Sequence, residues 1–347
     1  MTSLLRRFVR CLWANFLAAS GCLWWAKYRL RQSGAVIPLT FHRVLGEDDY
    51  RQTCSLDGMV LREQTFQELS AHVAICHQPV DLQTAEPGVQ RSKLAVAFTF
   101  DDGWVDTYSV AFPIARQCQI PIVVFVCPGL LDETTPFWPE QLIALMRQTE
   151  LSMEAEEAER LIERLKRAAA EEREQYLANL REKARGRFGA GESMGGDRTL
   201  SWAAIREMSE RGVCIGSHTQ THQVLTMVSA DSARRELRDS KAAIESTLSE
   251  KCDIFAYPNG NCSPQTRKLV AEAGYKLAVT TLSGAWTKDC DPLAIPRINI
   301  FEGKVIGWNR RFSATMFEYA TFWRAWRATR ANSKISAAYQ RSSQVPA

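Results

Sequence analysis

Short apolar stretches alternate with amphipathic helical patterns along most of this chain, and this alternation constrains the fold more than any other feature. Runs typical of buried strands lie at 34–44, 93–100, 121–129, 213–217, 254–260, 276–281 and 295–301. Helical patterns lie between them at 63–75, 107–120, 201–212, 233–248 and 264–273. Units of this size predict an α/β fold with a mostly parallel sheet, either open or closed into a barrel.

The alternation is interrupted once, and this divides the chain into four parts. Residues 35–133 and 198–300 carry the strand–helix units and are together large enough for a single domain. Residues 134–197 form an insertion rich in Ala, Glu, Arg and Leu, for which we expect one or two helices ending in the flexible stretch 189–197. Its composition does not decide whether it is a lid, a docking surface or a spacer. An N-terminal segment, 1–34, and a C-terminal tail, 301–347, flank the body.

Charge is distributed unevenly over these parts. Residues 1–31 contain six basic residues and no acid, and residues 303–347 contain eight basic residues against one acid, although the net charge of the chain is only +4. The middle is therefore acidic, which argues against a nucleic-acid groove across the body. Both basic ends also carry several Trp, Tyr and Phe residues, a combination that favours contact with an anionic membrane surface over nucleic acid.

The first helix pattern is amphipathic. Residues 4–16 place one face of apolar side chains opposite one face of arginines, so the segment can lie flat on anionic lipid. The apolar face comprises Leu5, Phe8, Val9, Leu12 and Phe16, and the basic face comprises Arg6, Arg7 and Arg10. A helix packed for structural reasons is the alternative, and a membrane span over 8–26 is disfavoured because Arg10 and Asn15 lie inside it.

Cysteine usage bears on the compartment. Ten cysteines are scattered singly along the chain, which favours a reducing environment. We therefore expect a cytoplasmic protein held peripherally on the inner face of the membrane. A periplasmic lipoprotein is the alternative, because "LAASGC" precedes Cys22, but the bulky "LWW" that follows is atypical of such a cleavage site.

Two adjacent aspartates, Asp101 and Asp102, follow the apolar run "KLAVAFTF" and precede Gly103. This position is the carboxyl end of a strand, where ligands bind in sheets of this type. Neighbouring carboxylates are costly there unless a cation or a chemical task separates their pKa values. The alternative is that one of them caps a helix beginning near Val105.

A second polar motif, "SHTQTH", follows the strand pattern at 213–217 and places His218 and His222 four residues apart. That spacing puts both imidazoles on one face if the segment is helical. Two histidines and one carboxylate are a recurrent set of ligands for a divalent metal with positions left open for water. One aspartate can complete such a set while the other remains free as a base.

The ordered motifs "TFDDGW", "SHTQTH", "FAYPNG" and "PRINI" resemble those of the polysaccharide deacetylases that share the NodB homology domain, also called carbohydrate esterase family four. The resemblance implies a distorted (β/α) barrel with Asp101 as catalytic base. It also implies that Asp102, His218 and His222 hold a divalent metal, zinc or else cobalt or nickel. The oxyanion would be stabilised by the backbone N–H of Tyr257, in a turn whose sequence, with Pro258 and Gly260, is equally typical of a purely structural turn.

The chain departs from the family pattern at the general acid. Many relatives use a histidine near the end of the domain, but no histidine follows His222 here. His42 ends the first strand pattern and is the best substitute, because imidazole titrates near neutral pH. Its motif "TFHRV" resembles that of bacterial exopolysaccharide deacetylases acting on N-acetylglucosamine polymers, although a structural histidine is an equal alternative. His72 and His77 are expected to be solvated.

Three further residues are candidates for the site. Ala256 stands where the family often has a basic residue, and Arg297 can replace that residue by pairing with Asp101; a surface salt bridge is the alternative. Trp104 and Trp286 can stack on a sugar face, though each fits a core position equally well.

Together, the two motifs and the family resemblance imply a metal-dependent hydrolase that removes N-acetyl groups from an amino-sugar glycan or a lipid-linked precursor, in exopolysaccharide or envelope synthesis. One alternative is a non-catalytic glycan-binding module that keeps the metal site. Another is an esterase or amidase that acts on O-acetyl groups or on a different amide with the same residues.

Overall fold

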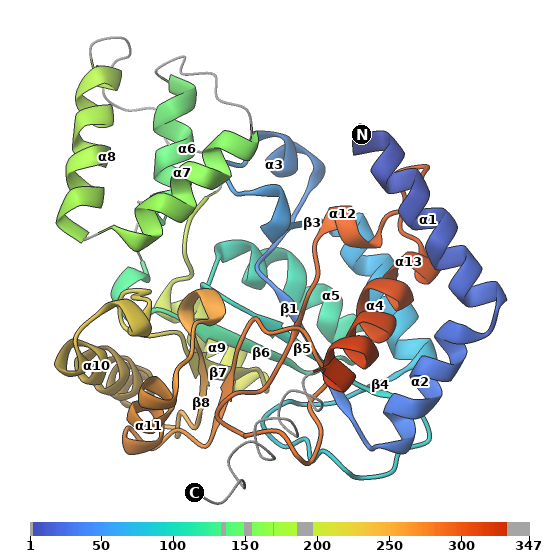
Figure 1. Cartoon of the computed structure of the whole chain (residues 1–347). Helices are drawn as coiled ribbons and strands as arrows, with labels where there is room; N and C mark the ends of the chain where they lie inside the picture. Colours follow the sequence, from blue (N-terminus) through green and yellow to red (C-terminus); the bar gives the residue numbers. More distant parts are fainter. Residues whose placement is uncertain (1–2, 133–136, 149–154, 169, 186–196, 332–347) are drawn as a thin grey trace, which may run out of the picture.

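The computed structural model describes residues 3–132, 137–148, 155–168, 170–185 and 197–331 (Figure 1). Its centre is one parallel sheet with the strand order β10-β1-β5-β6-β7-β8-β9, and β4 pairs with the start of β5. The strands are β1 (Val36–Phe41), β4 (Gln78–Pro79), β5 (Ala95–Phe100), β6 (Ile122–Val126), β7 (Cys214–Ser217), β8 (Ile254–Ala256), β9 (Leu277–Val279) and β10 (Ile298–Asn299). The predicted α/β fold with a parallel sheet is confirmed.

The sheet is curled so strongly that one segment links its two edges. Ile295 forms a parallel bridge with Val279 of β9, and Ile298, three residues later, pairs with Leu39 of β1. The strands β1, β5 and β6 are buried on both faces, as expected for parallel strands covered by helices. The arrangement is a distorted (β/α) barrel, in agreement with the prediction.

Helices cover the outside of the sheet at the predicted places: α4 (Glu63–Cys76), α5 (Phe112–Gln117), α9 (Trp202–Glu210), α10 (Ala230–Leu248) and α11 (Pro264–Glu272). A π-helical turn, Thr107–Ala111, leads into α5. Local signals fix the starts of these helices, because Ser201, Ser229 and Ser263 each accept a hydrogen bond from the backbone of the first turn. A small second sheet, β2 (Arg43–Leu45) with β3 (Val60–Arg62), and the short helix α3 (Glu47–Gln52) were not predicted.

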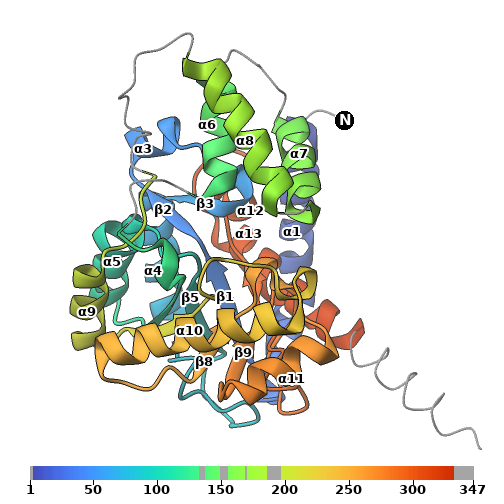
Figure 2. The same ribbon diagram turned by 90° about the vertical axis from the view of Figure 1, so that its left-hand side faces the viewer.

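The insertion contains three described helices where one or two were predicted: α6 (Trp138–Gln148), α7 (Ala155–Arg167) and α8 (Ala170–Arg185). They share an apolar core of their own that includes Leu142, Ile162 and Leu177. Figure 2 shows them gathered at one end of the molecule. Most of the stretch predicted to be flexible, 189–197, lies outside the described residues.

The N-terminal helices and the elements that follow β10 pack side by side on one flank of the barrel (Figure 1). The N-terminal segment forms α1 (Ser3–Ala19) and α2 (Cys22–Gln32). After β10 come α12 (Glu302–Val305), α13 (Ala314–Glu318) and a π-helical turn, Tyr319–Trp323. Phe317 and Phe322 are fully buried in the main core, so the described part of the predicted tail is integrated into the body. Within the described residues, we found no helix with the length and apolarity needed to span a bilayer.

Candidate metal and catalytic site

The predicted site residues converge at the carboxyl ends of the strands. Asp101 and Asp102 follow β5, His218 follows β7, and His42 follows β1. All of them line one pocket, together with His222. Neither aspartate caps a helix, so this alternative does not apply. The parallel topology explains the convergence, because it brings the carboxyl ends of neighbouring strands to one edge.

Asp102, His218 and His222 form a compact group of possible ligands. The Nε2 atoms of His218 and His222 lie 3.5 and 3.4 Å from Oδ1 of Asp102. Two outer contacts orient the group: His218 Nδ1 lies 2.7 Å from the carbonyl oxygen of Ala256, and Trp104 Nε1 donates to Asp102 Oδ2 at 3.2 Å. Two imidazoles, one carboxylate and oriented outer partners fit a divalent metal such as zinc.

The histidine motif is not helical, so a helix does not account for the four-residue spacing of the two imidazoles. Residues 218–222 form a loop in which Thr219 and His222 have φ values of 67° and 59°. Asp102 also lies in the left-handed region, with φ of 73°. Non-glycine residues rarely adopt this conformation, and such strain is concentrated at functional sites. The loop brings both imidazoles to Asp102 through these backbone conformations.

Asp101 is held by Arg297 as predicted, and the pair is buried, which excludes a surface salt bridge. Two hydrogen bonds of 2.7 Å join Arg297 Nη1 and Nη2 to the two carboxylate oxygens. Arg297 also donates to Thr99 Oγ1 at 3.0 Å and to the carbonyl oxygen of Thr280 at 3.0 Å. Burial acts to raise the pKa of Asp101, but the guanidinium outweighs it and the pKa is lowered. Asp101 is therefore ionised near neutral pH.

Comparison with known proteins identifies the family. A family model described as polysaccharide deacetylase matches residues 88–278, more than half of the chain. This chain belongs to the polysaccharide deacetylase family. The Bacillus subtilis protein YxkH, named as a polysaccharide deacetylase, is 30% identical over 116 residues, which cover 33% of this chain and 42% of YxkH. The match thus spans less than half the length of this curated relative.

Solved structures show the same fold. The Streptococcus pyogenes deacetylase PplD, in complex with acetate, superposes with a TM-score of 0.53 at 20% identity, covering 80% of this chain and 96% of PplD. IcaB from Ammonifex degensii gives a TM-score of 0.51 at 19% identity, covering 80% of this chain and 96% of IcaB. Members of this family generally use a divalent metal, in keeping with the group formed by Asp102, His218 and His222.

In this deacetylase-family protein the predicted oxyanion donor is already engaged. The backbone N–H of Tyr257 donates to the carbonyl oxygen of Val279 at 3.1 Å, as part of the pairing between β8 and β9. Asn259 lines the pocket two residues later, with φ of 57°. Its backbone N–H donates to no backbone carbonyl among the described residues. Pro258 and Gly260 shape this turn; a Cβ on Gly260 would lie 2.4 Å from the backbone nitrogen of Thr281. The turn is thus confirmed, but the assignment to Tyr257 is wrong.

Neither tryptophan is available for stacking on a sugar. Trp104 is fully buried, with Arg43 above its ring at 4.3 Å from the ring centre. Trp286 is buried at the opposite end of the sheet, where its backbone pairs with Val36 at the start of β1. Both belong to the core, and this corrects their assignment as substrate-binding residues.

Arg43 is a supporting residue that the sequence did not reveal. Its side chain is fully buried and forms ion pairs with Asp106, which precedes the insertion in sequence, and with Asp197, which ends it. Because it also packs on Trp104, it links the end of the insertion to the metal group. Nothing in the local sequence distinguishes it from an exposed arginine, since its partners are distant in sequence.

The insertion supplies one wall of the pocket. Phe137, Trp138 and Glu140, at the start of α6, line it together with Lys166 and Arg173 from α7 and α8. The described part of the insertion therefore borders the candidate pocket. Composition alone could not show this, because it predicts helices and not where they pack.

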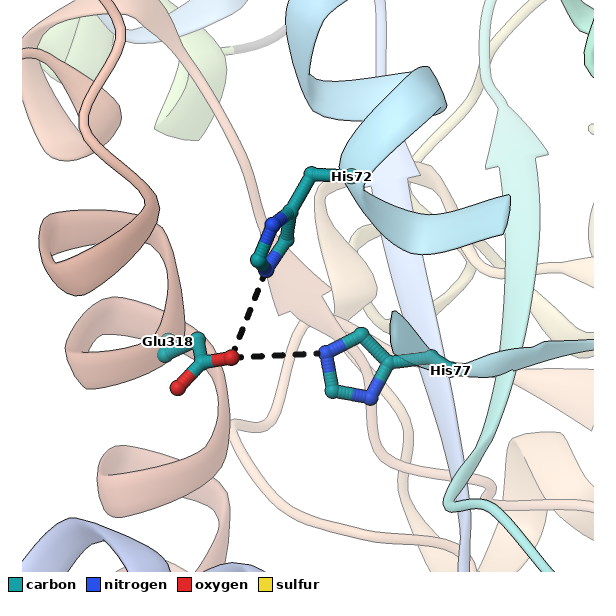
Figure 3. A group of neighbouring side chains, drawn as sticks. All are labelled: His72, His77 and Glu318. Carbon is teal, nitrogen blue, oxygen red and sulfur yellow. Dashed lines mark hydrogen bonds and ion pairs between the residues drawn. The ribbon is translucent and has the colours of Figure 1, made fainter. Parts of the chain in front are cut away.

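His42 lines the same pocket, and its Nδ1 is buried with no hydrogen-bond partner among the described residues. Its role as general acid stays a prediction. His72 and His77, in contrast, are not solvated as predicted. His77 is 4% exposed and His72 is partly buried, and both point toward Glu318 of α13 (Figure 3).

Proposed function

We propose that this protein is a metal-dependent deacetylase that hydrolyses N-acetyl groups of an amino-sugar glycan or a lipid-linked precursor. The main support for this proposal is a second buried carboxylate, that of Asp101. It lies in the same pocket as the possible metal ligands Asp102, His218 and His222. Metal binding alone has no use for this second acid, whereas hydrolysis needs a base beside the metal. A role in exopolysaccharide or envelope synthesis is part of the same proposal.

The residues of the pocket take the following roles. Asp102, His218 and His222 would hold zinc or a related ion, which when bound supplies Lewis-acid activation of water and of the acetamide carbonyl. Asp101 accepts the proton of the attacking water at a carboxylate oxygen, and Arg297 keeps that carboxylate ionised and oriented. The backbone N–H of Asn259 donates to the oxyanion. His42 protonates the departing amine.

The test is acetate release from N-acetylglucosamine oligomers by zinc-loaded protein. We expect release that stops on chelation and falls by about 10²–10⁴-fold in Asp101→Asn, which keeps the metal group intact. Metal content should be measured in parallel, because Asp101→Asn should still bind zinc. Release from wild type and Asp101→Asn at equal rates would reject the base assignment.

The rival functions give different results in the same assay. A non-catalytic module would bind the oligomers and release no acetate. An O-acetyl esterase would act on O-acetylated glycans and leave N-acetyl groups intact. If metal-loaded protein released acetate from neither class, the deacetylase proposal would be wrong.

We also propose that α1 and α2 bind an anionic membrane surface, on the cytoplasmic side. Although α1 is amphipathic, it packs on the body through Cys11, Ala14 and Leu17 and turns its wide apolar face to solvent. Leu12 and Phe16 on that face are 56% and 58% exposed. A soluble surface helix normally has the opposite orientation, so a covering partner is required.

The second helix continues this surface. Trp24 is 64% exposed, while Leu23 and Ala26 are buried against the body. Arg29 lies over the ring of Trp25, 5.4 Å from its centre, and so places a positive charge beside the aromatic face. Exposed aromatic residues next to arginines suit the boundary between lipid headgroups and acyl chains better than a dry protein interface. All ten cysteines, which lie in the described part of the chain, are unpaired, in keeping with a reducing compartment.

Vesicle co-sedimentation tests this surface. We expect binding to vesicles containing phosphatidylglycerol, weaker binding to purely zwitterionic vesicles, and loss of both in Leu12→Gln/Phe16→Gln. Trp308→Gln is the matched control, because Trp308 is exposed but lies outside these helices. Dimerisation of the wild type that the double variant abolishes, without vesicle binding, would instead identify a second copy of the chain as the occupant. Equal vesicle binding by both variants would reject the proposal.

A further inference from the structure

A second group of metal-ligand residues lies at the other end of the sheet. His77 directly precedes β4, which pairs with the first residues of β5, whereas the catalytic aspartates follow the last residue of β5. His72 lies in the last turns of α4, and Glu318 ends α13. Figure 3 shows both imidazoles pointing toward one oxygen of Glu318.

The spacing of this second group matches that of the catalytic group. The Nε2 atoms of His72 and His77 lie 3.3 and 3.7 Å from Oε1 of Glu318. The ligand atoms of each group all lie within 4.8 Å of one another. Two neutral imidazole nitrogens and one carboxylate oxygen at such distances can bind one zinc ion, whose bonds to nitrogen and oxygen are about 2.0–2.2 Å long.

One atom of this group is left unsatisfied. Nε2 of His77 is buried and has no hydrogen-bond partner among the described residues, because the nearest carboxylate oxygen is 3.7 Å away. A buried polar atom without a partner is costly and requires an explanation, and a bound metal ion is one such explanation.

We propose that His72, His77 and Glu318 bind a divalent transition metal, zinc in the first instance, at a structural site separate from the catalytic pocket. Lys27 binds the other oxygen of Glu318, Oε2, at 2.6 Å, and so leaves Oε1 to the metal. His72 and Glu318 are only partly buried, which leaves room for water to complete the coordination. In the described residues no second carboxylate joins this group, so it has ligands but no base.

The position of the site indicates what the metal would do. His72 and His77 belong to the body of the barrel, whereas Glu318 belongs to the C-terminal helix and is paired with Lys27 of α2. A metal here would therefore fasten α13 to the barrel, and through the Lys27–Glu318 pair also α2. Since metal binds only the folded arrangement, occupancy should raise thermal stability.

Metal stoichiometry tests the proposal without any measurement of activity. After dialysis against zinc and removal of free metal, wild type should hold two zinc ions per chain. His77→Phe, in which the new ring can keep the contact of His77 with Phe322, and His72→Gln should each hold one. His222→Phe should also hold one, because it removes a ligand of the catalytic group, and the double variant His77→Phe/His222→Phe should hold none.

Thermal unfolding provides the second readout. Zinc should raise the Tm of His222→Phe, which keeps the new site, and should not raise that of the double variant. If His77→Phe and His72→Gln hold as many zinc ions as wild type, or if the double variant still gains stability from zinc, the proposal is wrong. Retained acetate release by His77→Phe would show that this variant is folded.

Discussion

Arg297 and Asp101 meet through two parallel hydrogen bonds, and this geometry depends on the planar guanidinium of arginine. Lysine keeps the charge but cannot make both bonds, so Arg297→Lys should leave Asp101 less well oriented. We expect kcat/KM to fall on the order of 10²-fold. Because the guanidinium lowers the pKa of Asp101 against the effect of burial, weakening it should move the acidic limb of the pH–rate profile to higher pH.

The control for this variant is Arg238→Lys, on the exposed surface of α10. Its pH–rate profile should match that of wild type. An Arg297→Lys profile with an unchanged acidic limb would mean that Arg297 does not control the ionisation of the base.

Trp104 acts on the metal group through its indole nitrogen, which donates to the Asp102 oxygen that faces away from the histidines. Trp104→Phe keeps most of the ring and removes this donor. We expect zinc affinity to fall by about 10–100-fold, the usual effect of losing an outer partner of a metal ligand. Competition with a chromogenic chelator measures this, with Trp286→Phe as a buried control far from the site. Equal affinities of the two variants would contradict the prediction.

At the scale of elements, helix α6 brings a buried carboxyl, Glu140, to the wall of the pocket. Burial raises its pKa to about 8, and Ser55 Oγ donates to its side chain at 3.2 Å. The folded protein therefore keeps this proton at pH values where the unfolded chain, with an ordinary pKa near 4.5, has lost it. The contribution of Glu140 to the free energy of unfolding is therefore full at pH values below the unfolded-state pKa, and it is lost as pH rises toward 8.

Glu140→Gln should remove this pH dependence, because glutamine resembles the protonated acid at every pH. We expect wild-type stability to decline between pH 5 and pH 8 by up to about 1.4 kcal/mol per pH unit, and the variant to decline less. Urea unfolding across this range measures the slope. Glu157→Gln, at an exposed position in α7, should keep the wild-type slope. Parallel slopes for wild type and Glu140→Gln would contradict the prediction.

The elements differ in how well the sequence predicted them. Strand β5 and helix α11 carry strong local signals, an uninterrupted apolar run and a capping box at Ser263, and both appear where expected. The outward orientation of α1 could not be predicted, because amphipathicity shows two faces but not which one meets the body. The sequence left the conformation at His218 open, because the residues that adopt left-handed backbone there are not glycines.

At the scale of the whole molecule, the sequence motifs located residues that meet in one pocket but not the boundary of the fold. Asp101, Asp102 and the two histidines were found because each follows a strand, and parallel topology brings such positions together. The partners of Arg43 and the packing of residues after 300 involve contacts between distant parts of the chain, for which no local pattern exists. The basic residues after 300 led to the prediction of a separate C-terminal tail, although aromatic side chains of this segment, Phe317 and Phe322, are buried in the core.

Phe322 provides the test of that boundary. Its ring is fully buried in the main core, and the centre of the ring lies 4.5 Å from the centre of the His77 ring. If the C-terminal segment is part of the barrel's own core, Phe322→Ala should lower the free energy of unfolding by about 3–5 kcal/mol, in a single transition. Trp308→Ala, at a position in the same segment that is 74% exposed, should change it by about 0.5 kcal/mol or less. Equal effects of the two substitutions would mean that the barrel folds independently of the residues that follow β10.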